Sequence, residues 1–278
     1  MARSMTPAEK HRFQTYFPNL DVDQAVVTGE ISLVYNCISW TVGVTDRWLW
    51  PGASLANFDT FYRGFGFSRS NDGTITVWGQ STSANDPRVR FGPGARTALG
   101  AKCGDDLRIQ HGLNELAGSA YGRVVAFYRR NLLLKPVFAP ILEKAMNNKA
   151  AKSYLSAAQR KILGKQCAVV PATRRVAFES AFTTWKNTWF SGGLAVSSDP
   201  HTRAVGKEFD ALIALGPAIL PLVIEVLADP ENFLALQLYD AIQTDPRLLV
   251  QFEPDDERIL EGEQGRARRV VQAWFANQ

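Results

Sequence analysis

The pattern of apolar and polar positions changes character along this chain of 278 residues. In the first 132 residues, short apolar runs alternate with turn sequences such as Trp-Pro-Gly at 50–52 and Asn-Asp-Gly at 71–73. Two of the runs, TITVWG (74–79) and YGRVVAFYRR (121–130), are rich in β-branched and aromatic residues, which favours strands. We therefore expect an antiparallel sheet in this part of the chain.

A helix is predicted ahead of these strands, at residues 54–65. Ser54 is a good N-cap residue, and the apolar residues that follow it have helical spacing: Leu55, Phe58, Phe61 and Tyr62. A helix combined with an antiparallel sheet places residues 1–132 in the α+β class.

Residues 133–278 show mainly helical periodicity and form a second predicted domain, an all-α arrangement of helical hairpins. The pattern predicts a helix that ends at Gly164, one over 173–190, and one capped by Ser198 or Asp199. The stretch from Leu215 to Pro230 is similar to one HEAT-type hairpin, but no second copy supports a repeat array.

Bulk composition excludes several function classes. The net charge is only +4, with no run of five like charges, so nucleic-acid binding is not expected. Three cysteines without a CxxC pair form neither a disulfide framework nor a cysteine-rich zinc site, and no cofactor is expected.

The segments that would direct a chain to a membrane or export route are not evident in the sequence. No apolar run approaches the ~20 residues of a membrane span. The first residues, MARSMTPAEKHRF, lack the apolar stretch of a signal peptide. We expect a cytoplasmic protein without a membrane partner, although delivery by a route that needs no signal peptide stays open.

The candidate chemistry centres on SLVYNCISWTVG, residues 32–43. Asn36 is a good N-cap, which would place Cys37 at the first position of a short helix that ends at Gly43. Unpaired N–H groups there favour a thiolate and can stabilise an oxyanion. The competing interpretation is a buried, inert thiol, because free cysteine is among the most buried residue types.

This arrangement resembles the papain-like superfamily, in particular its compact bacterial branches related to NlpC/P60 amidases. More closely, YNCISWTVGVTDRWLWPG, TITVWG, AKCGDDLRIQHGL and YGRVVAFYRR resemble an uncharacterised bacterial family with the pattern YNC-I-A-W, W-x-W-P, S-K-x-G, I-x-H and Y-G-x-V. The resemblance covers residues 17–130. It implies a papain-like helix-plus-antiparallel-sheet fold with Cys37 as the nucleophile.

The resemblance leaves His111 as the partner of Cys37. Papain-like folds usually open a later strand with the histidine, but residues 83–96 contain none. His11 lies in the leader segment, so His111 in the I-x-H-G match is the candidate base, which must come within about 3 Å of the thiol. Asp106 is the candidate orienting residue, and the other acidic residues considered for that role are Asp46, Asp105 and Glu115.

Asn36, Trp40, Trp48 and Trp50 are the candidate substrate-binding residues, although tryptophans beside Pro51 can equally be core residues under a loop. Together these features predict a cysteine hydrolase or acyl-transferase that acts on an amide bond of a protein or peptide. The alternative is a catalytically degenerate papain-like domain that serves as a protein–protein interaction module, for example in a bacterial effector or toxin system.

Overall fold

The computed structural model describes residues 2–79, 91–96, 100–102, 106–110, 115–118, 121–138, 153–253 and 255–277. The chain divides into two compact units. The first contains residues 1–146, 192–199 and 253–260, and the second contains residues 147–191, 200–252 and 261–278. The first unit mixes helices with an antiparallel sheet and the second is helical, so the chain is α+β with a helical C-terminal region.

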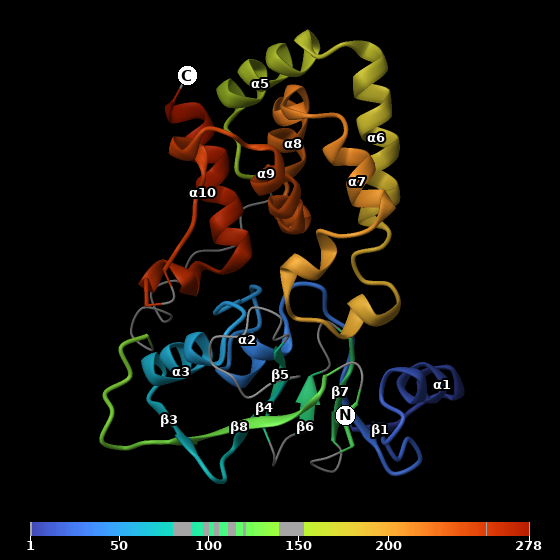
Figure 1. The fold of residues 1–278 in the computed structure, drawn as a ribbon, viewed down its shortest axis with the longest axis vertical. Coiled ribbons are helices and arrows are strands. Elements are labelled where there is room, and N and C mark those ends of the chain that lie inside the picture. Colours follow the sequence, from blue (N-terminus) through green and yellow to red (C-terminus); the bar gives the residue numbers. More distant parts are fainter. Residues whose placement is uncertain are drawn as a thin grey trace. The chain divides into compact units, whose positions relative to one another are not determined.

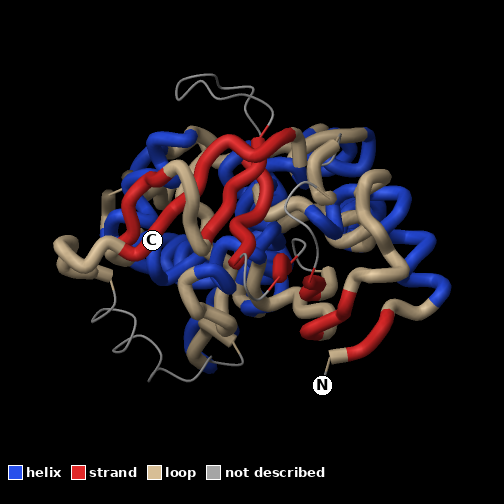
Figure 2. The backbone as a smooth tube through the Cα atoms, turned by 90° about the horizontal axis from the view of Figure 1, so that it is seen from below, coloured by secondary structure: helices blue, strands red, loops and turns tan. Residues whose placement is uncertain are grey.

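The described strands of the first unit form one antiparallel sheet in the order β1-β2-β7-β6-β5-β4-β8-β3. Their bounds are β1 Arg3–Ser4, β2 Val26–Gly29, β3 Phe67–Ser70, β4 Ile75–Gly79, β5 Phe91–Arg96, β6 Gly100–Lys102, β7 Arg108–Gln110 and β8 Arg123–Arg130. Every residue of β4 is buried, because β5 and β8 pair with its two edges and side chains cover both faces. Helices α2 (Cys37–Thr41) and α3 (Leu55–Gly64) lie over one face of the sheet (Figures 1 and 2).

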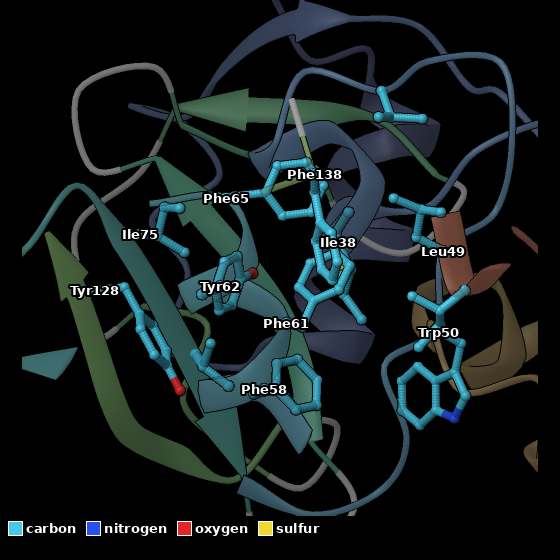
Figure 3. Packing of buried hydrophobic residues seen from close by; sticks show 14 of the residues in the cluster. Ile38, Leu49, Trp50, Phe58, Phe61, Tyr62, Phe65, Ile75, Tyr128 and Phe138 are labelled. Atoms are coloured by element: carbon cyan, nitrogen blue, oxygen red, sulfur yellow. The ribbon is translucent and has the colours of Figure 1, made fainter. Parts of the chain in front are cut away.

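The main apolar cluster of the first unit lies between α3 and the sheet. Tyr62 of α3 packs against Tyr128 of β8 with ring centroids 4.5 Å apart, and Figure 3 shows Phe58 and Phe61 beside them. Ile259 and Leu260, which directly precede the last helix of the chain, belong to the same cluster. A second cluster surrounds Phe13 of α1 (Pro7–Tyr16), a helix that begins with a capping box between Thr6 and Glu9.

The second unit is built from short helices: α5 Ala157–Val169, α6 Ala172–Lys186, α7 Lys207–Ile213, α8 Leu220–Leu227, α9 Leu236–Ile242 and α10 Gly262–Ala276, with 3₁₀ turns between several of them. Aromatic residues on α6 and just beyond it form a continuous buried row. Trp185 is perpendicular to Trp189 at 5.0 Å and contacts Phe209 of α7 at 5.2 Å.

Several local predictions are confirmed. The run TITVWG forms β4 and YGRVVAFYRR contains β8. Asn36 and Ser54 are the N-cap residues of α2 and α3, and each accepts a hydrogen bond from a backbone N–H three residues on.

Three other local predictions are wrong. Gly164 does not end a helix but lies inside α5, because a glycine costs only about 0.5–1 kcal/mol there and the Ser156–Gln159 capping box holds the helix start. The turn-rich sequence of residues 80–96 predicts a long loop, but its last six residues, 91–96, form β5. Ser198 and Asp199 cap no α-helix: a 3₁₀ turn follows, and α7 starts only after Gly206, whose φ is +94°.

None of the described helices is by itself long and apolar enough to cross a membrane. Residues Lys207–Ile213 and Pro217–Leu227 have that length and composition only as a pair, and the two helices are bent by 86° relative to each other.

Candidate functional site

Asn36 organises the backbone at the start of α2. Its Oδ1 accepts hydrogen bonds from the backbone N–H of Ser39 at 2.9 Å and from the Ser39 hydroxyl at 2.7 Å. Its Nδ2 donates to the carbonyl of Leu49 at 2.8 Å, and the Leu49 N–H donates to Oγ of Ser39. Asn36, Ser39 and Cys37 are all fully buried, so this polar cluster is closed off from solvent.

The thiol of Cys37 is in contact with a serine from the other half of the chain. Its Sγ lies 2.7 Å from Oγ of Ser198, which is 1% exposed. The Ser198 carbonyl accepts a hydrogen bond from Nε1 of Trp48 at 2.9 Å and a longer one from Nδ2 of Asn36 at 3.5 Å. Ser198 therefore contacts the thiol itself and accepts hydrogen bonds from two neighbouring side chains, and it covers the thiol.

Sequence reasoning missed Ser198. The Ser197-Ser198-Asp199 triplet has the composition of a helix N-cap, so the local sequence predicts a cap, and 161 positions separate Ser198 from Cys37. Residues 192–199 belong to the first compact unit, where Val196 is buried in the second apolar cluster. No local sequence pattern indicates that the chain returns to the first unit at residues 192–199. Only information that links residues far apart in the sequence could have placed Ser198 beside Cys37.

The predicted partners of Cys37 are only partly described. His111 lies outside the described residues, as do Asp105 and Cys103. Asp106 is 3% exposed and forms a two-pronged ion pair with Arg12 of α1, at 2.9 and 3.0 Å, and it also accepts from the Leu107 N–H. Its role as an orienting residue stays a prediction.

The three tryptophans predicted to bind substrate are buried. Trp48 donates to Ser198 as described, and Trp50 packs edge-on against Phe58 with centroids 6.1 Å apart. Trp40 is 6% exposed, and the guanidinium of Arg108 stacks over its ring at 5.7 Å. Trp40 thus lies in α2 and Trp48 contacts the residue that covers Cys37. Their role in binding a substrate stays a prediction.

Cys167 provides an internal comparison for Cys37. It lies on the inner face of α5 in the second unit, and its thiol donates to the carbonyl of Pro221 at 3.5 Å. Burial raises the pKa of this thiol to about 12, and the nearby Glu225 contributes in the same direction. Cys167 is therefore a protonated, unreactive thiol at neutral pH.

No metal site is found in the part of the chain that the structure describes. The histidine, cysteine, aspartate and glutamate side chains in these ranges form no group of three that could hold an ion. The polar groups gathered around Cys37 are amide, hydroxyl and indole groups. These groups suit hydrogen bonding to a carbonyl or a thiol.

The comparisons with known proteins identify one domain of uncharacterised type. Residues 26–129 match the family described as Domain of unknown function (DUF7689), which confirms the expectation of an uncharacterised domain family. The match runs from the start of β2 almost to the end of β8 and contains both Cys37 and His111. Neither the curated proteins nor the solved structures yielded a similar chain.

Proposed function

We propose that this protein is a papain-like cysteine hydrolase or acyl-transferase that acts on an amide bond, with Cys37 as nucleophile and His111 as base and acid. The observation that carries the proposal is the buried hydrogen-bond network of Asn36, Ser39, Trp48 and Ser198 around the thiol. An inert core cysteine packs as a small apolar residue and needs no such network. Burying polar groups is costly unless each finds a partner, so their concentration here favours a site.

In the proposed reaction, His111 takes the proton of the Cys37 thiol, and the sulfur attacks the amide carbonyl carbon. The C–N bond breaks, His111 returns the proton to the leaving amine, and a thioester to Cys37 remains. Water hydrolyses this thioester, or another nucleophile accepts the acyl group. The backbone N–H groups at the start of α2 face the developing oxyanion.

Turnover by this route requires that the thiol becomes accessible. Cys37 has no exposed surface while the hydroxyl of Ser198 is in contact with its sulfur. A substrate carbonyl must replace this hydroxyl, so residues 192–199 have to move away from the thiol or rearrange. We therefore expect Ser198 to limit the rate at which any reagent reaches Cys37.

The same burial favours a second candidate, the degenerate interaction module. If the cover over Cys37 never opens, the network serves only to attach residues 192–199 to the first unit, and the domain presents a fixed surface to a protein partner. The two candidates differ in whether Cys37 reacts.

Alkylation of the intact protein with iodoacetamide, followed by peptide mass spectrometry, separates them. An activated Cys37 labels faster than a model thiol across pH 5–8, because a paired thiolate persists at low pH. The variant Ser198→Gly should label faster still, since it removes the hydroxyl that covers the sulfur. His111→Gln should abolish the reaction at low pH while leaving the fold intact.

Cys167 is the internal control, because its raised pKa keeps it unlabelled over this range. Labelling of Cys37 no faster than a model thiol in both the native protein and Ser198→Gly would refute the hydrolase proposal and leave the interaction module.

A further inference from the structure

The segment that follows β8 exposes two adjacent leucines. Leu132 and Leu133 are 92% and 93% exposed, the highest values among the large apolar side chains that the structure describes, and Val137 is 56% exposed. Figure 1 shows this segment in light green as it leaves β8. Exposed apolar side chains that lie together are a feature of interaction surfaces.

The backbone of this segment is held in place. The N–H of Asn131 donates to the Gly66 carbonyl at 2.9 Å, and the Asn131 side chain accepts from the Leu133 N–H at 3.0 Å. At the other end, the Phe138 N–H donates to the Gly64 carbonyl at 3.0 Å, and the ring of Phe138 is buried beside Phe65 (Figure 3). The two leucines are thus presented by an anchored turn.

The sequence on both sides of the leucines is cationic. The sequence RRNLLLKPVF, residues 129–138, contains two arginines and a lysine and no acidic residue. Lys135, and Arg63 in the last turn of α3, are exposed and have no acidic partner among the described residues. Arg129 is also exposed and pairs with Asp72 at the surface.

We propose that residues 129–137 form a docking loop for an anionic lipid surface. Leu132 and Leu133 would enter the interface between headgroups and acyl chains, while Lys135, which lies two positions after them, contacts the lipid phosphates and carboxylates. A turn that presents two side chains outward suits a fluid surface, which adapts to it, whereas a protein partner would need a matching pocket. The proposal requires no spanning helix and is independent of the chemistry of Cys37.

Vesicle cosedimentation of the full-length chain tests this loop. Phosphatidylcholine vesicles that contain phosphatidylserine should pellet the protein at low salt, and pure phosphatidylcholine vesicles should bind it much less. The double variant Leu132→Ser/Leu133→Ser should lose about tenfold or more in partitioning, since both apolar side chains are removed. Lys135→Glu should weaken binding and reduce its salt dependence.

The matched control is Val169→Ser/Val176→Ser, which removes two exposed valines of the second unit that are 84% and 65% exposed. It should bind vesicles as the native chain does, and circular dichroism should show that all variants are folded. Absence of binding by the native chain, or equal binding by the leucine variant, would overturn the proposal. A leucine variant that turns a dimer into a monomer in sedimentation, with vesicle binding unchanged, would assign the patch to self-association instead.

Discussion

Asn36 is the residue on which most polar contacts around Cys37 depend. A helix N-cap ordinarily satisfies one or two backbone donors of its own helix. Asn36 does this and in addition uses its Nδ2 to reach the carbonyl of Leu49, in a loop 13 positions on, and that of Ser198. One side chain therefore fixes the start of α2, the following loop and the returning segment at once.

Replacement of Asn36 by alanine should cost about 2–4 kcal/mol in the free energy of unfolding. The loss combines a helix cap, worth about 1 kcal/mol, with buried groups left without a partner, worth about 1–3 kcal/mol. Urea denaturation followed by tryptophan fluorescence measures it. Ser54→Ala is the matched control, because Ser54 caps α3 in a partly buried position and should cost only about 1 kcal/mol. Equal losses in both variants would mean that Asn36 is an ordinary cap.

Cys167 should make the protein less stable as the pH rises into the alkaline range. Its folded-state pKa of about 12 lies above the ordinary thiol value of about 8.5, so the folded chain retains a proton that the unfolded chain releases. The stabilisation is complete below about pH 8.5 and declines as the pH rises toward 12. Urea midpoints of Cys167→Ala between pH 8 and 10 should fall less steeply with pH than those of the native protein. Parallel slopes would contradict the raised pKa.

At the scale of elements, the turn after β8 and the end of α3 fit together because Gly64 has no side chain. A Cβ atom at this position would lie 2.2 Å from Cε2 of Phe138, which packs against Phe65 with ring centroids 5.4 Å apart. Gly64 therefore leaves room for the aromatic ring that anchors residues 131–138. Gly164 in α5 differs, since a Cβ there would meet no atom within 4 Å.

Alanine at these two glycines should change stability in opposite directions. Gly64→Ala displaces the Phe138 ring and should cost about 1–3 kcal/mol, as overpacking generally does. Gly164→Ala should gain about 0.5–1 kcal/mol, because alanine is the better helix former and meets open space. Thermal denaturation monitored by circular dichroism compares both with the native chain. A neutral Gly64→Ala would show that the Phe138 ring moves without cost.

At the scale of the whole molecule, the first compact unit is not one continuous stretch of chain. Val196 is buried in one of its apolar clusters, and Ile259 and Leu260 are buried in the other. The region that matches the uncharacterised family, residues 26–129, therefore contains fewer residues than the unit that packs together. The C-terminal half supplies part of the core of the first unit as well as the serine beside Cys37.

A chain truncated to residues 1–146 should consequently fail to unfold cooperatively. Losing Val196, Ile259 and Leu260 removes three buried apolar side chains, each worth about 1.5–3 kcal/mol, so the total is about 5 kcal/mol or more. That loss is comparable to the whole stability of a typical domain. Differential scanning calorimetry of the fragment should show no sharp unfolding transition. The variant Leu260→Ala in the full chain should keep a sharp transition at a lower temperature. A cooperative fragment with native stability would mean that these segments are dispensable.

The sequence alone determined those features that are set by neighbours along the chain. The cap at Asn36, the end of α2 near Gly43, the strands in TITVWG and YGRVVAFYRR, and the helix behind Ser54 follow from local hydrogen bonding and side-chain periodicity. The placement of Gly164 inside a helix did not follow, because burial of the α5 inner face outweighs the weak preference of one residue.

Only the tertiary structure decided what lies against Cys37. Local propensity assigned Ser198 to a helix cap, yet burial of Val196 brings its segment into the first unit and sets the Ser198 hydroxyl against the thiol. Likewise, the pattern of RRNLLLKPVF does not say which apolar side chains are exposed. In the structure Leu132 and Leu133 are exposed and Phe138 is buried, and hydrogen bonds to Gly66 and Gly64 hold the two ends of the segment. Contacts between positions far apart in sequence depend on packing of the whole chain, and periodicity within a short window carries no information about them.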